Sequence, residues 1–351
     1  MTYSAYGEGE KPRFYGAKED GVGAEKWTLY YEGANGEKIW KFYRDMRETG
    51  GVIFNGGASW AERVYGWWVE GSGYMQYDDT TKSFTPEACL TSDMTMCNII
   101  DYSGCSYPIL AHSLNREGGL YVRCDKGNPG ALFSEVEFET TETPTNGWTG
   151  LVECASDCVI DNLCVMYWAQ CGIRSDPQEQ HGVVVQNCEV AWGGDAVHEY
   201  RQAQPARDYM LSGDGIYGIL DGGTVSGNYC HDVDGNGITV ESAGNHTDAA
   251  MEGGLFVLKN LTERCAQGIW LHDPHHRFSV KGKLVIRVNL CLYIGESYTH
   301  GSPGPYYGIA VSDGMTLRSG VEITDNTVYR AKDALLYIGP NVTLANNRFY
   351  Q

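Results

Sequence analysis

An asparagine that returns in the same short apolar setting constrains this chain more than any other feature. It occurs at Asn162, Asn187, Asn228, Asn260, Asn289, Asn326 and Asn347. The flanking strings align as CVIDNLCV, VVVQNCEV, GTVSGNYC, LFVLKNLT, LVIRVNLC, VEITDNTV and VTLANNRF, with gaps of 25, 41, 32, 29, 37 and 21 residues. An internal repeat with a period of roughly 20 to 50 residues is typical of solenoids.

A second apolar strand follows most of these asparagines and is usually opened by Gly and Ile. It begins at Gly172-Ile173, Gly237-Ile238, Gly268-Ile269 and Gly308-Ile309, with Ala196-Val197 and Ala334-Leu335 as variants. Asparagine tolerates the left-handed conformations of a bend, and stacked asparagines bond to one another between rungs about 4.8 Å apart. The sequence therefore predicts an all-β fold, a parallel β-helix in which each repeat forms one rung of two strands.

The 351 residues exceed the usual size of a single core, but a solenoid grows by adding rungs. We expect a partial rung at residues 1–19, an inserted β-rich module at 20–150 and the regular rungs at 151–351. The module is rich in aromatic residues, which predict either a platform for stacking sugars or ordinary core packing. The aromatic residues considered are Trp60, Trp67, Trp68, Tyr74 and Tyr77.

The cysteines and the first residues bear on the compartment. Eight of the twelve cysteines lie in or beside rung strands, where a reduced cysteine behaves as a small buried hydrophobe: Cys154, Cys158, Cys164, Cys171, Cys188, Cys230, Cys265 and Cys291. Residues 1–30 lack a signal-peptide core, and no apolar run approaches the ~20 residues of a membrane helix. The residues as they stand predict a cytoplasmic protein. Both ends resemble interrupted rungs, so we also expect a fragment, which is extracellular if an export signal precedes it.

The formal net charge is −19. So acidic a surface repels nucleic acid and polyanionic glycans, and it favours a neutral ligand. The chain has no basic stripe, no phosphate-binding glycine loop with lysine and no Gly-x-Ser-x-Gly motif. The expected partner is a neutral polysaccharide or oligosaccharide, with no nucleic acid and no membrane, and the expected state is a monomer or weak oligomer.

Acidic residues recur three to five positions after the start of the second strand. They are Asp176, Glu199, Glu241, Asp273 and Asp313. Like charges stacked about 5 Å apart repel one another and need a compensating use. Glycoside hydrolysis uses two carboxyls, polysaccharide elimination uses Ca²⁺ with a basic residue, and the third use is structural or cation-binding only.

Few basic residues lie near these acids, which makes a lyase the second reading and a non-catalytic glycan-binding or structural β-helix the third. The cluster His272, Asp273, His275 and His276 matches neither HExxH nor a structural zinc pattern. We therefore expect no metal site and no cofactor, with Ca²⁺ required only for the lyase.

Two strings, GIWLHDPHHR and LYIGESYTHGSPG, resemble the right-handed β-helix glycoside hydrolases, which include the family 120 β-xylosidases and family 141 enzymes. The resemblance implies a right-handed β-helix, a xylan-like plant substrate, a nucleophilic Asp directly after Gly-(Leu/Ile)-Trp-Leu and an acid about twenty residues on. Here His272 follows Leu271, Asp273 comes next, and Glu296 lies 23 residues beyond Asp273. The string Ala191-Trp192-Gly193-Gly194 is also similar to uncharacterised bacterial β-helix proteins.

Our hypothesis is that Asp273 and Glu296 form the catalytic pair, with Glu241 as the substitute partner and solvated loop acids as the alternative. The expected substrate-binding residues are Trp192, Asp195, His198, Glu199, Asp214, Tyr217, His231, Trp270, His272, Tyr306 and Tyr307. Trp270 is expected to point into the core. Insertions at residues 200–213 and 242–252 are predicted to close one end of the groove.

Overall fold

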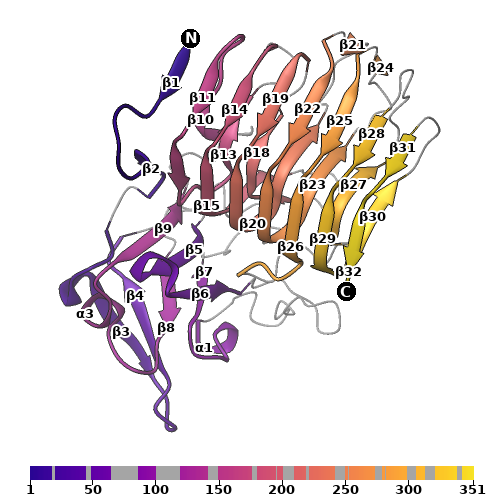
Figure 1. Cartoon of the computed structure of the whole chain (residues 1–351). Helices are drawn as coiled ribbons and strands as arrows, with labels where there is room; N and C mark the ends of the chain where they lie inside the picture. Colours follow the sequence, from indigo (N-terminus) through magenta and orange to yellow (C-terminus); the bar gives the residue numbers. More distant parts are fainter. Residues whose placement is uncertain are drawn as a thin grey trace.

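The structure is a computed structural model. It describes residues 1–17, 20–44, 49–64, 86–99, 119–140, 149–175, 180–194, 196–200, 209–218, 221–241, 250–251, 253–272, 279–280, 282–298, 306–312, 321–337 and 342–351. Strands from successive repeats pair in parallel and stack along one axis, from the N-terminal end to the C-terminal end (Figure 1). The predicted all-β parallel β-helix is confirmed.

One face of the β-helix is an eight-stranded sheet in which every pair is parallel. Its strands, in spatial order, are β1 (Thr2–Ser4), β11 (Val159–Asp161), β14 (Val184–Gln186), β19 (Gly223–Ser226), β22 (Leu255–Leu258), β25 (Leu284–Arg287), β28 (Val321–Thr324) and β31 (Val342–Ala345). The asparagines of the repeat lie at the end of this sheet.

A thirteen-stranded sheet forms the other two faces. One of these faces contains β2 (Arg13–Tyr15), β12 (Cys164–Met166), β15 (Glu189–Gly193), β26 (Leu290–Ile294), β29 (Thr327–Ala331) and β32 (Arg348–Tyr350). The other contains β10 (Gly150–Glu153), β13 (Cys171–Arg174), β18 (Asp214–Tyr217), β27 (Tyr307–Ser312) and β30 (Asp333–Tyr337). The long strands β20 (Tyr229–Glu241) and β23 (Leu261–His272) run through both faces and join them.

Each rung therefore contains three strands, such as β11, β12 and β13, where the sequence predicted two. The missed strand starts directly after the asparagine turn. In the first rungs this strand is only three to five residues long, as in β12 and β15. Apart from Gly227 before β20, neither glycine nor proline separates it from the strand before, so most of the repeats carried no sign of a second corner.

Each rung turns through residues in the left-handed conformation, and these residues form two columns. The first column contains Asn162, Asn187, Gly227, Lys259, Val288, Asp325 and Asn346. The second contains Tyr167, Trp192, Asp232, Arg264, Tyr293 and Arg330. Such a φ is uncommon outside glycine and asparagine, so the stacking of the rungs imposes it.

The asparagines predicted to form one column occupy two. Asn162 and Asn187 are left-handed turn residues, one position before the true ladder position. The ladder itself starts at Asn228, whose Oδ1 accepts a hydrogen bond from the backbone N–H of Cys188. Each Nδ2 then donates to the Oδ1 of the next asparagine at 3.0 Å, through Asn228, Asn260, Asn289, Asn326 and Asn347. The one-residue error arose because asparagine suits both positions.

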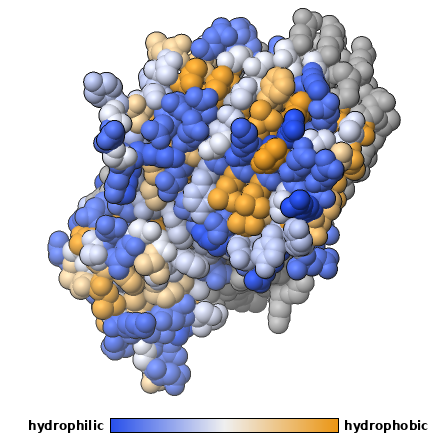
Figure 2. Space-filling model, viewed as in Figure 1, coloured by the Kyte–Doolittle hydropathy of each residue, from blue (hydrophilic) through white to orange (hydrophobic). Residues whose placement is uncertain are grey.

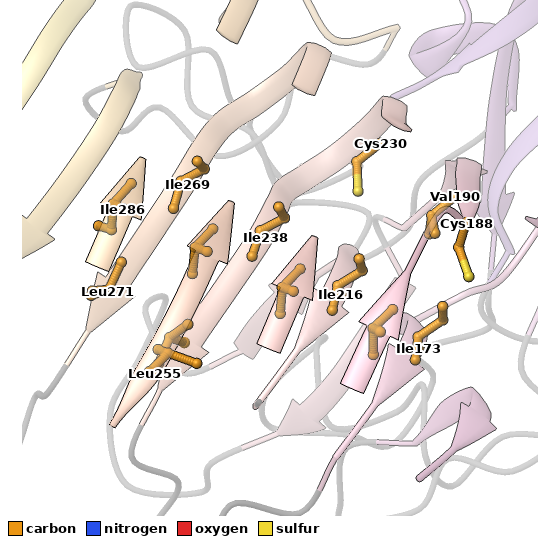
Figure 3. Close-up of a cluster of buried hydrophobic side chains, with 14 of the residues drawn as sticks. Ile173, Cys188, Val190, Ile216, Cys230, Ile238, Leu255, Ile269, Leu271 and Ile286 are labelled. Carbon is orange, nitrogen blue, oxygen red and sulfur yellow. The ribbon is translucent and has the colours of Figure 1, made fainter. Parts of the chain in front are cut away.

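Aliphatic and cysteine side chains fill the interior of the β-helix in stacked columns (Figure 3). Ile173, Ile216, Ile238, Ile269 and Ile309 form one such column, because their strands pair at these residues. The eight cysteines predicted to be buried and reduced are buried and free: Cys154, Cys158, Cys164, Cys171, Cys188, Cys230, Cys265 and Cys291.

A second body, the module, lies beside the first rungs (Figure 1). Its seven-stranded sheet contains β3 (Trp27–Glu32), β4 (Lys38–Phe42), β8 (Gly119–Arg123), β7 (Thr95–Ile99), β6 (Ser59–Arg63), β5 (Thr49–Phe54) and β9 (Val136–Thr140). Short helices accompany it: η1 (Ala24–Lys26), η2 (Asn55–Gly57), α1 (Pro86–Cys89) and α3 (Pro129–Leu132). Trp27, Phe42, Phe54 and Phe138 fill a core of its own.

Two small sheets lie outside the rungs. β16 (Ala196–Tyr200) pairs antiparallel with β17 (Tyr209–Ser212), and β21 (Ala250–Met251) pairs with β24 (Ser279–Val280). The prediction of a rung strand at Ala196-Val197 is therefore wrong. Within the residues that the structure describes, no helix has the length and apolar character needed to cross a membrane. The face seen in Figure 2 is mostly hydrophilic, with small separate apolar patches.

Candidate functional site

A groove with a volume of about 710 Å³ lies between the first rungs and the module. Its floor is the outer surface of β2, β12, β15 and the start of β20. Gly56, Glu135 and Glu137 form its wall on the module side. The segment before β2 contributes Glu10 and Lys11.

The floor consists of two columns of outward side chains. One column runs through Arg13, Cys164, Glu189 and Tyr229, and the other runs through Tyr15, Met166, Ala191 and His231. Side chains alternate across a strand, so the intervening Val165, Val190 and Cys230 point into the β-helix core. The parallel register therefore brings side chains that are far apart in the sequence to one surface.

The wall comes from β9, where glutamate alternates with apolar residues in the string SEVEFET. Val136 and Phe138 are buried in the core of the module. Glu135, Glu137 and Glu139 lie on the opposite side of the strand, which faces the β-helix. This glutamate row runs from the exposed Glu135 through the half-buried Glu137 to the fully buried Glu139.

Burial sets the protonation of the two inner glutamates. Burial first, and then the negative charges of Asp20 and Glu135, raise the pKa of Glu137 to about 7. Complete burial raises the pKa of Glu139 well above the ordinary value, although a hydrogen bond from Tyr298 opposes the shift. The Tyr298 hydroxyl donates this bond to Oε2 of Glu139 at 2.5 Å. A carboxyl that keeps its proton near neutral pH can act as a general acid.

On the floor, Glu189 has the opposite environment. His231 Nε2 lies 3.5 Å from Oε1 of Glu189, and this hydrogen bond is the main reason that the pKa of Glu189 is lowered. Glu189 is thus an ionised carboxylate in the same groove as the proton-bearing Glu137.

Aromatic side chains close the angle between floor and wall. Trp192 packs with its ring centroid 5.3 Å from that of Tyr298 and 5.9 Å from that of Trp60 in the module. Tyr167 and Trp192 also line the groove. Gly57 lies against Trp192, and a Cβ at this position would overlap the indole ring. The module and the β-helix can approach this closely only with glycine here.

The structure describes only part of the predicted catalytic set. Asp273 lies outside the described residues, and of Glu241 the structure describes the backbone, which pairs with His272 on the next rung. Glu296 follows β26 at an exposed position, 3.4 Å from Arg330. The backbone N–H of Gly295, the residue before Glu296, donates a hydrogen bond to the carbonyl of Cys265 in the first half of β23. Asp273 instead follows the far end of that strand in the sequence. The pairing of Asp273 with Glu296 stays a prediction.

The predicted column of acids loses one member. Glu199 belongs to the β16–β17 hairpin, where it pairs with Met210, and not to a rung. Asp176 and Asp313 lie outside the described residues, as do Asp195 and most of the 200–213 and 242–252 insertions. The predicted cluster around His275 and His276 is also outside them.

The predicted binding residues divide into three groups. Trp192 and His231 line the groove. Asp214 and Tyr217 are buried in β18, and Asp214 accepts hydrogen bonds from the backbone and side chain of Asn236. Apart from Asp195 and Trp270, the remaining residues lie beyond the groove, or their side chains are not described: His198, Glu199, His272, Tyr306 and Tyr307.

The prediction that Trp270 points inward is wrong. Its neighbours Ile269 and Leu271 are both in the β-helix core, so Trp270 faces the outer side of β23. A strand of three large apolar residues does not show by itself which of its two faces is buried.

Sequence reasoning missed Glu137 and Glu189. The alternation of glutamate with Val and Phe in SEVEFET was a detectable sign of a strand with one acidic face. Glu189 stands two residues after Asn187, in the strand that the sequence did not predict.

Residues 150–349, which are more than half of the chain, match the family model described as the right-handed beta helix region. This match agrees with the predicted handedness. No curated protein and no solved structure matches the chain.

Proposed function

Because the chain belongs to the family of right-handed β-helix proteins, we propose that it is a carbohydrate-active enzyme that hydrolyses glycosidic bonds in the groove between the β-helix and the module. The observation that carries the proposal is a groove in which two carboxyls, Glu137 and Glu189, stand in opposite environments. Glycoside hydrolysis requires such a division between one proton-bearing carboxyl and one ionised carboxylate.

In this proposal Glu137 donates its proton to the oxygen of the leaving sugar. Glu189 acts on the other side of the bond, either as the nucleophile or as the base that activates water. Tyr15, which is 43% exposed, offers a ring face for a sugar, whose C–H groups pack well against aromatic surfaces. Tyr167 and Trp192 also line the groove but are largely buried.

The substrate in this proposal is a neutral glycan. Glu10, Glu135, Glu137 and Glu189 all line the groove, and the chain carries a net charge of −19, so an anionic sugar would be repelled. The xylan-like substrate implied by the resemblance to family 120 β-xylosidases is neutral in its backbone, and it is the first substrate to test.

The test is an assay on neutral plant glycans and aryl glycosides that measures reducing ends. We expect Glu137→Gln and Glu189→Gln each to lower kcat by about 10²- to 10⁴-fold. Glu32→Gln, at an exposed position at the end of β3, is the control and should retain activity. Asp273→Asn is assayed in parallel, and a loss confined to that variant would move the site to the resemblance-based residues. Full activity of both groove variants would refute the assignment.

Elimination is the second candidate, because Lys11 and Arg13 bring basic side chains to the groove. Lys11 Nζ donates a hydrogen bond to the Asn187 carbonyl at 2.6 Å, and Arg13 forms an ion pair with Glu10 at 3.0 Å. Both basic groups therefore already have partners in the described structure, which makes elimination the second candidate and not the first. The same assay with added Ca²⁺ distinguishes the mechanisms, because elimination leaves an unsaturated product that absorbs in the ultraviolet.

A further inference from the structure

His231 stands between two carboxylates from different rungs. Its Nδ1 lies 2.7 Å from Oδ2 of Asp232, and its Nε2 faces Oε1 of Glu189 across 3.5 Å. The Tyr229 ring stacks on the imidazole with a centroid distance of 4.2 Å and an interplanar angle of 27°. The imidazole is therefore fixed both in its plane and in the direction of its two nitrogen atoms.

Arg264 supports Asp232 from the next rung. Its Nε and Nη2 each lie 2.7 Å from one oxygen of Asp232, a bidentate ion pair. Asp232 and Arg264 occupy the same left-handed turn position on neighbouring rungs, with φ of 51° and 48°. The repeat thus places the two side chains next to each other, and a bidentate guanidinium pair has a fixed geometry.

Glu263 completes the surroundings of the imidazole. It pairs with His231 across the rungs, accepts a hydrogen bond from the Tyr229 hydroxyl at 2.6 Å and contacts Arg264. Glu189, Asp232, Tyr229, Glu263 and Arg264 thus surround His231 in the part of the chain that the structure describes, and the positive charges of Lys11 and Arg13 act on Glu189.

The side chains in this series of contacts differ in their exposure to solvent. The side chains of His231 and Asp232 are 12% and 5% exposed, whereas that of Glu189 is 37% exposed. Glu189 is the member best placed to meet a substrate, and Asp232 acts only through His231.

We propose that His231, held by Asp232 and Arg264, is a positioning residue that aims the carboxylate of Glu189 into the groove and keeps it ionised. This inference rests on the proposed function, because it assumes that Glu189 takes part in the reaction. It explains why the two groove carboxyls divide their roles as they do. Among the described residues, the negative charges of Asp20 and Glu135 act on Glu137, whereas the imidazole of His231 forms a hydrogen bond with Glu189.

The protonation of His231 agrees with this role. Burial lowers the pKa of His231, but the hydrogen bonds with Asp232 and Glu189 outweigh it, so the pKa is raised overall. Burial likewise raises the pKa of Asp232, and the hydrogen bonds from Arg264 and His231 more than reverse this, so the pKa is lowered. The pKa shifts of Glu189, His231 and Asp232 therefore all favour a carboxylate, imidazolium, carboxylate series.

The first measurement needs no activity. The imidazole resonances of His231 are followed by NMR across pH in the full chain and are assigned by their absence in His231→Gln. We expect the midpoint of the titration to move to lower pH in Asp232→Asn and in Glu189→Gln, since each change removes a negative neighbour. An unchanged midpoint in Asp232→Asn would overturn the proposal.

The second measurement is the pH profile of kcat/KM on the substrate found in the glycan assay. In His231→Gln and Asp232→Asn we expect the acidic limb to move to higher pH, with about a 10- to 100-fold loss of kcat and little change in KM. Arg264→Lys keeps the charge and should recover part of what Arg264→Met loses. A loss of stability without a moved limb would show a purely structural role and refute the proposal.

The two measurements separate the possible failures. If the His231 titration responds as expected but the protein has no glycosidase activity, the proposed function is rejected and the contacts around His231 are supported. If the protein is an active glycosidase but the acidic limb of its pH profile is the same in all variants, the proposed function stands and the positioning role of His231 is rejected.

Discussion

Glu135, directly before β9, and Glu137 and Glu139 within it differ in how deeply their side chains are buried. Glu135 is exposed, Glu137 is half-buried and Glu139 is completely buried against Tyr298. Within the described residues, Oε1 of Glu139 has no hydrogen-bond partner. Burying an ionised carboxylate in this way is costly, so Glu139 keeps its proton, and the same trend holds more weakly for Glu137.

Replacing Glu139 with Gln should make the protein more stable than the wild type, and this difference should grow as pH rises. A raised pKa in the folded state means that the folded protein retains a proton that the unfolded chain has lost. The free energy of unfolding therefore falls as pH increases above about 4.5, the ordinary glutamate value. Denaturant titrations of wild type and Glu139→Gln between pH 4 and 8 should diverge, with the variant increasingly the more stable. Parallel curves, or the same divergence in the exposed Glu135→Gln, would contradict the role of burial.

At the scale of the element, the turns between rung strands decide which residues form the ladder. The first left-handed column accepts Gly227 and three asparagines easily, but it also holds Val288, a β-branched residue with φ of 59°. A valine in this conformation is strained, because its branched Cβ meets the neighbouring carbonyl oxygen. The ladder asparagine that follows at Asn289 fixes the backbone and does not allow the turn to relax.

Val288→Asn should relieve this strain. Val288 is 46% exposed, so little packing is lost, and asparagine already occupies the same position at Asn162, Asn187 and Asn346. We expect the free energy of unfolding to rise by about 1 kcal/mol, measured by chemical denaturation. Val288→Thr keeps the branched Cβ and should change little. An equal gain in both variants would show that polarity, not backbone strain, is responsible.

At the scale of the whole molecule, the site depends on the docking of two bodies. The wall of the groove comes from β9, and its floor comes from strands that follow it in the sequence. Trp192, Tyr298 and Ile53 form the apolar contact that holds the module against the rungs. The separation between Glu137 and Glu189 is thus set by packing between the bodies and not by either body alone.

Gly57→Val should separate the module from the rungs, because its side chain would overlap the ring of Trp192. We expect loss of glycosidase activity and greater quenching of tryptophan fluorescence by acrylamide. Gly36→Val is the matched control: Gly36 has the same φ of 93° but nothing within 4 Å of an added Cβ. If the two variants behave alike, backbone strain rather than docking explains the effect.

The repeat in the sequence predicted the β-helix because each rung obeys the same local rules of alternation and turn chemistry. The same rules located His231 and Trp192, which belong to the rungs. They did not pair Glu137 with Glu189, because no periodicity relates β9 to β15. Contacts between segments that are distant in the sequence, such as that of Gly57 with Trp192, determine which face of β9 lies toward the β-helix.

The asparagine ladder has a direction. From Asn228 to Asn326 every side-chain amide nitrogen donates one hydrogen bond to the amide oxygen of the next ladder asparagine on the C-terminal side. Its other hydrogen bond goes to a backbone carbonyl of the preceding rung. Aligned amides polarise one another, so each bond strengthens its neighbours in the way that peptide dipoles add along an α-helix. The solenoid therefore carries an electric axis along its length, built from side chains, that the nearly cancelling dipoles of its sheets would not provide.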